Sequence, residues 1–562
     1  MEILRGWLPA VLAIDDPIAR RGLCHLADGI WNSGEITNGF SREVQDVEHG
    51  AEPVSDTQPL MCLVEYGNPI YLERCLETMA AMRDVWTTTN AHGHRHFKAH
   101  HFSATEVNAR PPKDVDVALN GRAANPGLLP LWYSRNPGVE QLLGEWVGAW
   151  IEDAFRTNQG KPAGFVPGSI RVADERFGGH AERWWQTRDY FADFETVDYT
   201  ATLYNLMVGM FGATGDDAWM RCLRATTEAV HQQHTAPQNT TTTGTAAWAA
   251  QVSDSESLAD VIGKWRAQTG DRGFDAFLAR RGSPYQRYLI DGQLEALNTE
   301  LRKIITALSA NIEMSTSEVL FTDRVSLPGN EVLFEMMTGS LGVATYWPMH
   351  AVTWEKTGGD VAVLVEQASS TELTAQLHSF SATPLNISAR LWRLAPGEYS
   401  QQLSRGDAVL SDSKPSVTER GQPLALVLPA RQTLRLRLRQ LSTAAEQPAR
   451  RPDLALGPDA IVVDGPLIAG QPTTLRLTVH NVGSAAAMAS QGELFADSGR
   501  IATVSCPALD APLDFRACRA VIEVPWTPSR AGSHELRLVL REREGVFSGN
   551  NQWRTTVSVV KP

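Results

Sequence analysis

The residue pattern of the chain changes near residue 312, and this change limits the folds that the chain can adopt. Before it, apolar residues recur every three or four positions among good helix formers, which predicts helices in segments such as 71–85, 139–155, 217–233 and 293–308. After it, β-favouring residues alternate or run between Gly, Pro and Asp in segments such as 361–366, 424–428, 433–438 and 474–480. The chain is therefore predicted to be helical first and β-rich second.

The helical half repeats a signal for helix starts, an Asn or Asp cap that is in most cases followed by Pro at the first helical position. The signal occurs at Asp16-Pro17, Asn68-Pro69, Asn136-Pro137 and Asp216-Asp217, with Gly270-Asp271 as a further candidate. Long segments rich in Gly, Pro, Asn, His or Trp lie between the resulting helix pairs, at 31–47, 87–119, 157–196 and 234–255. This alternation predicts stacked helical hairpins with tight turns at one end and long loops at the other.

The long-loop end is where we expect the functional site. Long ordered loops on a rigid scaffold commonly carry binding and catalytic residues. If the hairpins close into a ring, this end also receives the N-termini of the inner helices, whose free N–H groups favour an anion. The expected fold class is multidomain α+β, with a helical domain at 1–312, an antiparallel β-sandwich at 313–442, a polar linker at 443–451 and an immunoglobulin-like β-sandwich at 452–562.

The amino-acid composition limits the kinds of molecule that the chain is expected to bind. The 562 residues include 51 Lys plus Arg against 64 Asp plus Glu, a net charge of −13 that argues against nucleic acid as the main partner. No apolar run approaches the roughly 20 residues that span a bilayer, and residues 8–14 do not read as a signal peptide. The six cysteines form no C-x-x-C pair, and the sequence leaves open whether Cys506 and Cys518 are bonded.

Two parts of the chain resemble known families. The tail resembles a CARDB module, an immunoglobulin-like domain often appended to bacterial extracellular enzymes, on the segments Pro452-Asp453-Leu454, 475–483, Pro525-Trp526-Thr527-Pro528 and Asn550-Asn551. The helical hairpins followed by β-sheet resemble, in architecture, the α/α-toroid polysaccharide lyases and related glycosidases. The resemblance implies a bacterial protein that is secreted or periplasmic, with its signal peptide absent from this sequence. It also implies that the tail is an interaction or spacer module outside catalysis.

Four polar residues are expected to meet at the mouth of the ring. His49, Asn120, Arg122 and Tyr199 lie 14 to 19 residues before the next tight turn. At 1.5 Å per residue this places them at similar heights, roughly 21–29 Å above the turns. A β-eliminating lyase needs a group that neutralises a uronate carboxylate, a base and an acid. Arg122 or Asn120 suits the first role, and Tyr199 or a histidine suits the other two. The structural alternative is that these residues cap helices and form hydrogen bonds between helices.

A histidine-rich loop follows at residues 92–101, where five of the 14 histidines lie. We take His94 and His96 as catalytic candidates and Arg95 as a substrate-binding candidate. In an extended loop His92, His94 and His96 would share one face, which permits a divalent metal. The alternatives are that these histidines are simply solvated, or that they act directly on the substrate. No cofactor is therefore expected unless this loop holds a metal.

The loop at 164–185 and its surroundings supply further candidates. Arg171 and His180 are expected to hold a carboxylate or sulfate, and aromatic side chains are expected to stack on sugar rings. The substrate-binding candidates are Arg95, Arg171, His180, Trp184, Trp185 and Tyr204. Acids that a glycoside hydrolase needs are also present, namely Asp174, Glu175 and Glu182 in this loop and Glu48 with Glu52 earlier.

The preferred prediction is a polysaccharide lyase that cleaves an anionic, uronic-acid-containing glycan by β-elimination. The alternatives are a glycoside hydrolase with paired carboxylates and a non-catalytic glycan-binding protein. The sequence contains no Gly-rich phosphate loop, no G-x-S-x-G and no H-E-x-x-H, which argues against nucleotide hydrolysis, serine esterase and zincin chemistry. The expected partner is therefore an anionic polysaccharide or oligosaccharide, with no nucleic acid and no membrane span.

Overall fold

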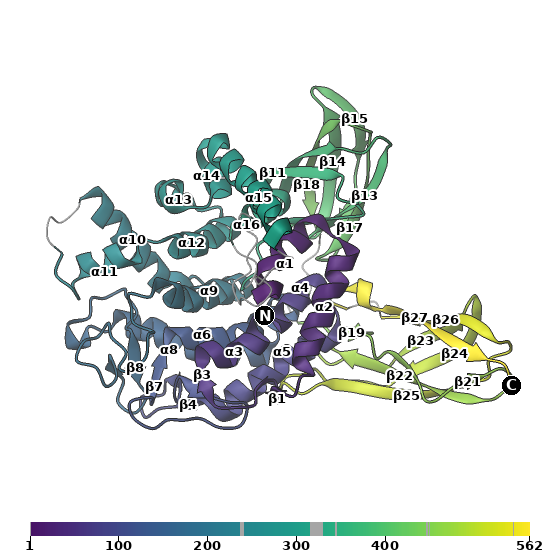
Figure 1. Cartoon of the computed structure of the whole chain (residues 1–562), viewed down its shortest axis with the longest axis horizontal. Coiled ribbons are helices and arrows are strands. Elements are labelled where there is room, and N and C mark those ends of the chain that lie inside the picture. Colours follow the sequence, from purple (N-terminus) through teal and green to yellow (C-terminus); the bar gives the residue numbers. More distant parts are fainter. Residues whose placement is uncertain are drawn as a thin grey trace.

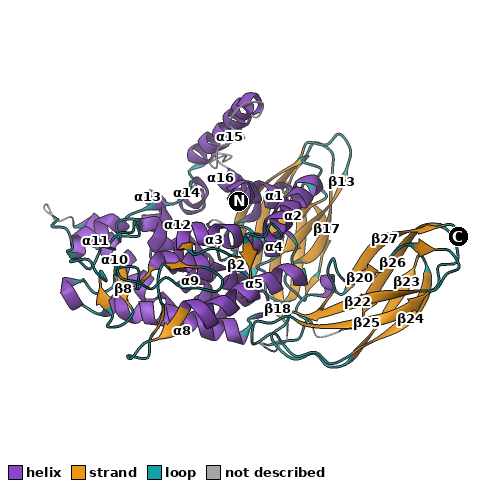
Figure 2. Cartoon of the chain, turned by 60° about the horizontal axis from the view of Figure 1, so that its bottom comes forward, coloured by secondary structure: helices purple, strands orange, loops and turns teal. Residues whose placement is uncertain are grey.

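The fold combines a helical body with antiparallel sheets, in the order that the sequence predicts (Figure 1). It is a computed structural model that describes residues 2–236, 241–314, 330–342, 346–444, 448, 450–542 and 545–562. The helices gather in one body, and the longer strands form two separate groups beside it (Figure 2). The predicted α+β class is thereby confirmed.

The helical body contains the helices that begin before residue 312 and one helix, α16, that begins after it. They are α1 (Glu2–Ile14), α2 (Pro17–Trp31), α3 (Val47–Ser55), α4 (Gln58–Val64), α5 (Pro69–Ala81), α6 (Gly121–Ala124), α7 (Leu128–Ser134), α8 (Pro137–Phe155), α9 (Val197–Thr214), α10 (Arg221–Thr235), α11 (Ala246–Ser253), α12 (Glu256–Thr269), α13 (Asp275–Arg281), α14 (Pro284–Asp291), α15 (Leu294–Met314) and α16 (Asn330–Thr338).

Three helices begin directly after the predicted caps. The side chain of Asp16 accepts hydrogen bonds from the backbone at the start of α2, Asn68 does so for α5, and Asn136 for α8. Each cap satisfies N–H groups that a helix start leaves without partners. The turns before these caps are short, and the helices on either side pack together, as α1 does on α2, α4 on α5 and α7 on α8. The predicted helical pairs with tight turns are confirmed here.

The long loops contain short strands that the sequence analysis did not predict. These are β1 (Ile36–Thr37), β2 (Phe40–Ser41), β3 (Gln45–Asp46), β4 (Thr87–Thr89), β5 (Arg95–Phe97), β6 (His101–Phe102), β7 (Val115–Val117), β8 (Ser169–Arg171) and β9 (Arg176–Phe177). β3 pairs with β6, and β7 pairs with β8, so separate long loops hydrogen-bond to one another. The loops therefore form one connected layer.

The first β group forms two sheets, with strand orders β10-β13-β17 and β11-β12-β18-β14-β15. Along β18, Leu434, Leu436 and Leu438 are buried while the arginines between them are exposed, the alternation expected for a strand with one face on a core. The strands are β10 (Val352–Glu355), β11 (Val361–Ala368), β12 (Glu372–Ser379), β13 (Leu385–Leu391), β14 (Gly397–Arg405), β15 (Ala408–Ser413), β16 (Ser416–Val417), β17 (Gln422–Leu428) and β18 (Thr433–Thr443).

The second β group has its own apolar core and two sheets. One sheet has the order β19-β22-β20 with β25 on β22, and the other has the order β21-β27-β26-β23-β24. The strands are β19 (Leu454–Ala455), β20 (Ile461–Val463), β21 (Leu467–Ile468), β22 (Thr473–Asn481), β23 (Ser490–Ala496), β24 (Gly499–Cys506), β25 (Cys518–Trp526), β26 (Gly532–Leu540) and β27 (Gln552–Val560). Both Cys506 and Cys518 are free thiols, so no disulfide joins β24 to β25.

The change from helix to sheet comes later than residue 312. Helix α15 runs through this position to Met314, and α16 precedes the first strand of the β half. Residues 315–329 lie outside the described part of the chain, as do some residues of the predicted linker at 443–451. Among the described residues, no helix is both long and apolar enough to cross a membrane.

Loops of the second β group dock on two of the tight turns of the helical body. The Asn550 side chain donates a hydrogen bond to the Gly67 carbonyl at 3.1 Å, and the Asn136 side chain donates one to the Pro512 carbonyl at the same distance. Tyr133 donates its hydroxyl to the buried Asp453 carboxylate, which also accepts from Asn550. The loop strands β7 and β8 lie at the opposite side of the helical body from this contact (Figure 1).

Candidate functional site

Three of the predicted site residues meet around the first turns of α3. Asp46 ends β3 and caps α3 by accepting hydrogen bonds from the backbone of Glu48 and His49. Arg122 on α6 and Tyr199 on α9 reach this helix from segments far along the chain. The arrangement depends on the contacts that α3 and α9 each make with α6.

Asp46 and His49 form a hydrogen-bonded carboxylate–imidazole pair. The His49 Nδ1 atom lies 2.9 Å from Asp46 Oδ2, and 61% of the His49 side chain is exposed. The hydrogen bond to Asp46 raises the pKa of His49 above its usual value. Because Asp46 holds Nδ1, the other ring nitrogen of this exposed side chain is free to take a proton from a ligand.

Tyr199 contacts Glu48, which stands between Asp46 and His49 in the sequence. Its hydroxyl donates a hydrogen bond to Glu48 Oε2 at 3.3 Å. Burial, reinforced by the nearby Glu48 carboxylate, raises the pKa of Tyr199 to about 12. The phenol therefore keeps its proton near neutral pH and can donate it.

An aromatic wall extends from Tyr199. Phe191 lies 5.6 Å from the Tyr199 ring and 4.4 Å from Tyr190, measured between ring centroids. Phe191 is 47% exposed, which is unusual for a large apolar side chain packed on other rings. Exposed aromatic faces of this kind suit stacking on the apolar face of a sugar ring.

Arg122 is the cation of the site, and several acids surround it. Its guanidinium binds the Asp56 carboxylate and lies 3.6 Å from Glu52 and 3.9 Å from Glu48. Burial opposes the charge, but the Asp56 carboxylate outweighs it and raises the pKa of Arg122. Arg122 is therefore a permanent positive charge. It is held in place by Glu48 and Glu52 of α3 and by Asp56, the residue that follows α3.

A large cavity borders this group of residues. Its volume is about 770 Å³, and α1, α9, α12, α14 and α16 contribute to its lining. Asp198, which precedes Tyr199, lines the cavity, and so does Arg5, which lies 3.5 Å from Asp56. The Arg122 environment thus continues into a space large enough for several sugar units.

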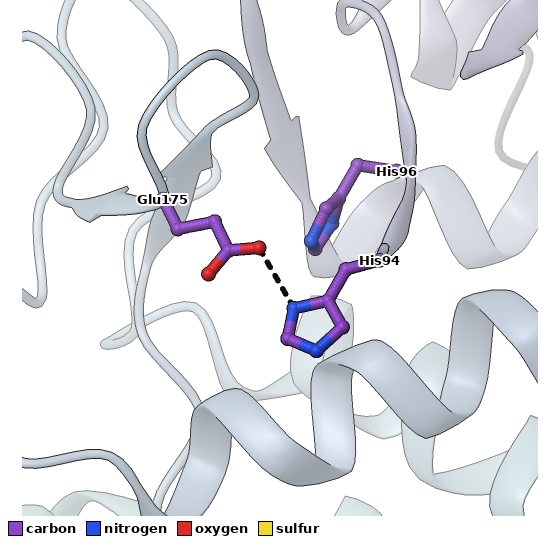
Figure 3. A group of neighbouring side chains, drawn as sticks. All are labelled: His94, His96 and Glu175. Carbon is purple, nitrogen blue, oxygen red and sulfur yellow. Dashed lines mark hydrogen bonds and ion pairs between the residues drawn. The ribbon is translucent and has the colours of Figure 1, made fainter. Parts of the chain in front are cut away.

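The histidine-rich loop forms a second, more buried group of residues. His94 Nδ1 lies 2.7 Å from Glu175 Oε1, and His96 lies beside this pair (Figure 3). His96 Nδ1 lies 3.0 Å from Asp116, whose other oxygen accepts a hydrogen bond from Asn120 at 2.8 Å.

The predicted metal trio of His92, His94 and His96 does not form. His92 is exposed, while ligand atoms of His94, His96 and Glu175 lie within 4.8 Å of one another. Glu175, which the sequence analysis assigned to hydrolase chemistry, therefore takes the place expected for His92. Among the described residues, these three are the His, Cys, Asp and Glu side chains whose ligand atoms lie this close to one another.

Several predicted residues are buried and cannot contact a polysaccharide in this conformation. His96 and Asn120 are enclosed around Asp116, and the indole N–H groups of Trp146 and Trp150 also bond to that carboxylate. The predicted stacking residues Trp184 and Tyr204 are also buried in the apolar core. Their aromatic faces contribute to packing, because a sugar could reach them only if the core opened.

Other predicted residues remain near the surface with ionic partners. Arg171 pairs with Asp174, His180 lies 2.6 Å from Asp114, and Arg95 donates a hydrogen bond to Glu145 at 2.6 Å. Trp185 is partly buried against Trp248 and Trp184. None of these side chains joins the group around α3 through a described hydrogen bond or ion pair.

Sequence reasoning missed Asp46, Asp56, Asp116 and Tyr190. Asp46 had a local signal, since it stands three residues before His49 and directly before a helical pattern. Asp56 and Asp116 acquire their roles only when helices and strands from distant segments pack together, so the local pattern carries no signal for them.

Comparisons with known proteins identify no family. No protein-family model matches the chain, and no curated protein matches it. Among solved structures, it is similar to the CARDB domain of a Pyrococcus furiosus protein, with 19% identity, a TM-score of 0.16, and coverage of 20% of this chain and 90% of that one.

Two structures of carbohydrate-processing enzymes are also similar in part. A polysaccharide lyase has 8% identity and a TM-score of 0.13, with coverage of 36% of this chain and 34% of that one. A GH2 β-galacturonidase from Eisenbergiella tayi has 10% identity and a TM-score of 0.13, with coverage of 34% and 36%. At these TM-scores the likenesses carry no information about chemistry.

Proposed function

We propose that this chain is an enzyme that cleaves a uronic-acid-containing polysaccharide by β-elimination at the residues around α3. One observation carries the proposal. The Asp46–His49 pair and the protonated Tyr199 hydroxyl meet at neighbouring positions of one helix, next to the permanent charge of Arg122. A base, an acid and a cation are the three groups that the reaction needs.

The proposed chemistry assigns one step to each group. His49, oriented by Asp46, removes the proton at C5 of the uronate. The electron pair forms the C4–C5 double bond as the C4–O bond breaks, and Tyr199 gives its proton to the departing glycosidic oxygen. Arg122 neutralises the substrate carboxylate and so stabilises the negative charge that develops beside it.

The substrate carboxylate would have to take the place of a protein carboxylate beside Arg122. Glu48 suits this exchange, because it lies 3.9 Å from Arg122 and its side chain is 28% exposed. Its departure would also release the Tyr199 hydroxyl, whose bond to Glu48 would be replaced by one to the substrate oxygen. Phe191 would stack on an adjacent sugar ring.

The finer architecture belongs to the same proposal. We propose that the helical hairpins form an incomplete α/α toroid, supported by the contact of α1 with α16, which brings the two ends of the helical series together. The domain at 452–562 is then a CARDB-like, immunoglobulin-fold module. The corresponding compartment is outside the cytoplasm, as expected for an enzyme that acts on a polysaccharide.

The test is a panel of anionic polysaccharides incubated with the full chain. We expect absorbance from unsaturated uronates to rise with at least one of them, and we expect Tyr199→Phe and His49→Gln each to lower the rate by about 100-fold or more. Tyr288→Phe and His378→Gln are the matched controls, because both residues lie outside the site, on α14 and β12. They should retain the wild-type rate.

A glycoside hydrolase is the second candidate, favoured by the acids around Arg122. Glu48, Glu52 and Asp56 approach this one guanidinium, and hydrolases use paired carboxylates. This candidate predicts new reducing ends without unsaturated products, and loss of activity in Glu48→Gln. Binding without any cleavage would instead contradict both enzymatic proposals.

A further inference from the structure

We infer that His94, His96, Glu175 and Asp153 bind one divalent transition-metal cation, with Zn²⁺ as the best match. The site is separate from the residues around α3 and does not depend on the proposed function. His94 and His96 flank the start of β5, Asp153 lies on α8, and Glu175 lies in the turn before β9. A cation here would join three segments of the chain.

Three of the proposed ligands have the mutual spacing of ligands on a common ion, and the fourth, Asp153, lies next to His96. Ligand atoms of His94, His96 and Glu175 lie within 4.8 Å of one another (Figure 3). Asp153 Oδ2 lies 3.7 Å from His96 Nε2. Ligands that share a tetrahedral Zn²⁺, each at about 2.0–2.2 Å from the ion, are expected to lie about 3.3–3.6 Å apart. Small side-chain adjustments would bring these atoms to that geometry.

Two of these atoms are buried without hydrogen-bond partners among the described residues. They are His96 Nε2 and Asp153 Oδ2, which face each other at 3.7 Å, an ion-pair distance that is too long for a hydrogen bond, and both side chains are 0% exposed. Buried polar atoms almost always have a partner, because leaving one unpaired costs about 1–3 kcal/mol. An ion that both atoms coordinate would remove this cost at both atoms.

The outward-facing nitrogens of the two imidazoles complete the pattern. His96 Nδ1 lies 3.0 Å from Asp116, and His94 Nε2 lies 3.0 Å from Glu152. The second nitrogen of His96 has no hydrogen-bond partner, and the second nitrogen of His94 lies 2.7 Å from Glu175, itself a proposed ligand. Metal-binding histidines typically have one ring nitrogen held by a carboxylate, which fixes the tautomer and the ring orientation.

Arg156 is the competing cation, and its position leaves room for the ion. It binds Asp153 through Oδ1 and Glu175 through Oε2. The oxygens left for the ion are Asp153 Oδ2 and Glu175 Oε1, the atoms nearest the two imidazoles. Counting Asp116 and Glu152, the described carboxylates here outnumber this one arginine, so a divalent cation improves the charge balance.

The ligand chemistry selects the class of metal. Two imidazole nitrogens and two carboxylate oxygens in a compact set suit Zn²⁺ better than Ca²⁺ or Mg²⁺, which prefer six or more oxygen ligands. All four positions would be taken by side chains, which is typical of a structural site. The expected role is to fix β5, α8 and the β8–β9 turn to one another.

The test measures metal content and thermal unfolding of the full chain. We expect one Zn²⁺ per purified chain, a lower unfolding midpoint after chelation, and recovery on adding Zn²⁺. Glu175→Gln should bind Zn²⁺ at least tenfold more weakly and lose the response of the midpoint. His92→Gln is the matched control, because His92 belongs to the same loop but is exposed, and it should behave as wild type.

A second measurement needs no variant. Co²⁺ added to the chelated wild-type chain should give the intense visible absorption of a tetrahedral centre, and Zn²⁺ should abolish it. If wild type neither contains nor takes up Zn²⁺ and its midpoint ignores chelation, the inference is wrong. It is equally wrong if His92→Gln loses the metal as Glu175→Gln does. It is also wrong if lowering the pH stabilises the chain while Zn²⁺ has no effect, because the carboxylates would then be held by protonated histidines alone.

Discussion

Histidines paired with carboxylates occur in several places, and exposure separates their roles. The His49 side chain is 61% exposed beside Asp46, whereas the His96 side chain is 0% exposed beside Asp116. The sequence analysis treated both as catalytic candidates, because residue type and spacing carry no information about burial. Only His49 can meet a polymer, and His96 is better suited to hold a buried partner.

The pKa of His49 leads to a prediction about pH. The hydrogen bond that His49 donates to Asp46 raises this pKa, so His49 is a competent base only above a pH higher than the usual 6.5. Activity should therefore fall as the pH drops through the raised pKa. Asp46→Asn should move this acidic limb to lower pH, with a smaller maximal rate, in a pH–rate profile. An unchanged limb would show that His49 is not the base.

At the level of elements, helix and strand positions follow from local signals, whereas site contacts do not. The Asn136-Pro137 pair predicts the start of α8, and alternation predicts β18, because capping and burial patterns act within a few residues. Glu175 reaches His94 only because β7, β8 and β9 pair across long stretches of chain. Such pairing leaves no local pattern. Helix α15 ends at Met314, close to the predicted change near residue 312, and α16 is a further helix beyond it.

Two helix caps, one on the surface and one at a contact between distant segments, should contribute differently to the free energy of unfolding. Asp16 caps α2 on the surface, whereas Asn136 caps α8 and also donates a hydrogen bond to Pro512 across the molecule. Asp16→Ala should lower the free energy of unfolding by about 1 kcal/mol. Asn136→Ala should cost about 1 kcal/mol more, because a buried contact is lost as well. Denaturant unfolding measures both, and equal losses would mean that the contact with Pro512 contributes nothing.

At the level of the whole molecule, the C-terminal strands are held by buried polar contacts. His480 on β22 lies 2.6 Å from Glu73 on α5 and 3.1 Å from Asp459. Tyr66 of the helical body packs its ring 4.9 Å from Phe547. The tail expected from the resemblance was an interaction or spacer module. The contacts predict that it unfolds together with the helical body.

The His480 contact makes the stability depend on pH. Although burial opposes the charge, the hydrogen bonds to Asp459 and Glu73 raise the pKa of His480 to about 9. A raised pKa contributes stability that is fully present below about pH 6.5 and is lost as the pH rises through 9. The shift corresponds to about 3 kcal/mol as an upper bound. Thermal unfolding midpoints should fall from pH 6 to 10 more in wild type than in Glu73→Gln. Parallel slopes would contradict this assignment.

The tight turns at Gly67 and Asn136 therefore contact both the helix that follows each turn and the C-terminal part of the chain. Each begins a helix of the body and also receives a loop of the second β group, through Asn550 and through the Pro512 carbonyl. An insertion at either turn would misplace a cap and a docking contact together, so their lengths should stay fixed in any relative that keeps this arrangement. Among the described residues, no observed hydrogen bond or ion pair joins the long loops at 31–47, 87–119, 157–196 and 234–255 to the C-terminal strands. Divergence in substrate choice can therefore accumulate there without disturbing the joint between the two halves.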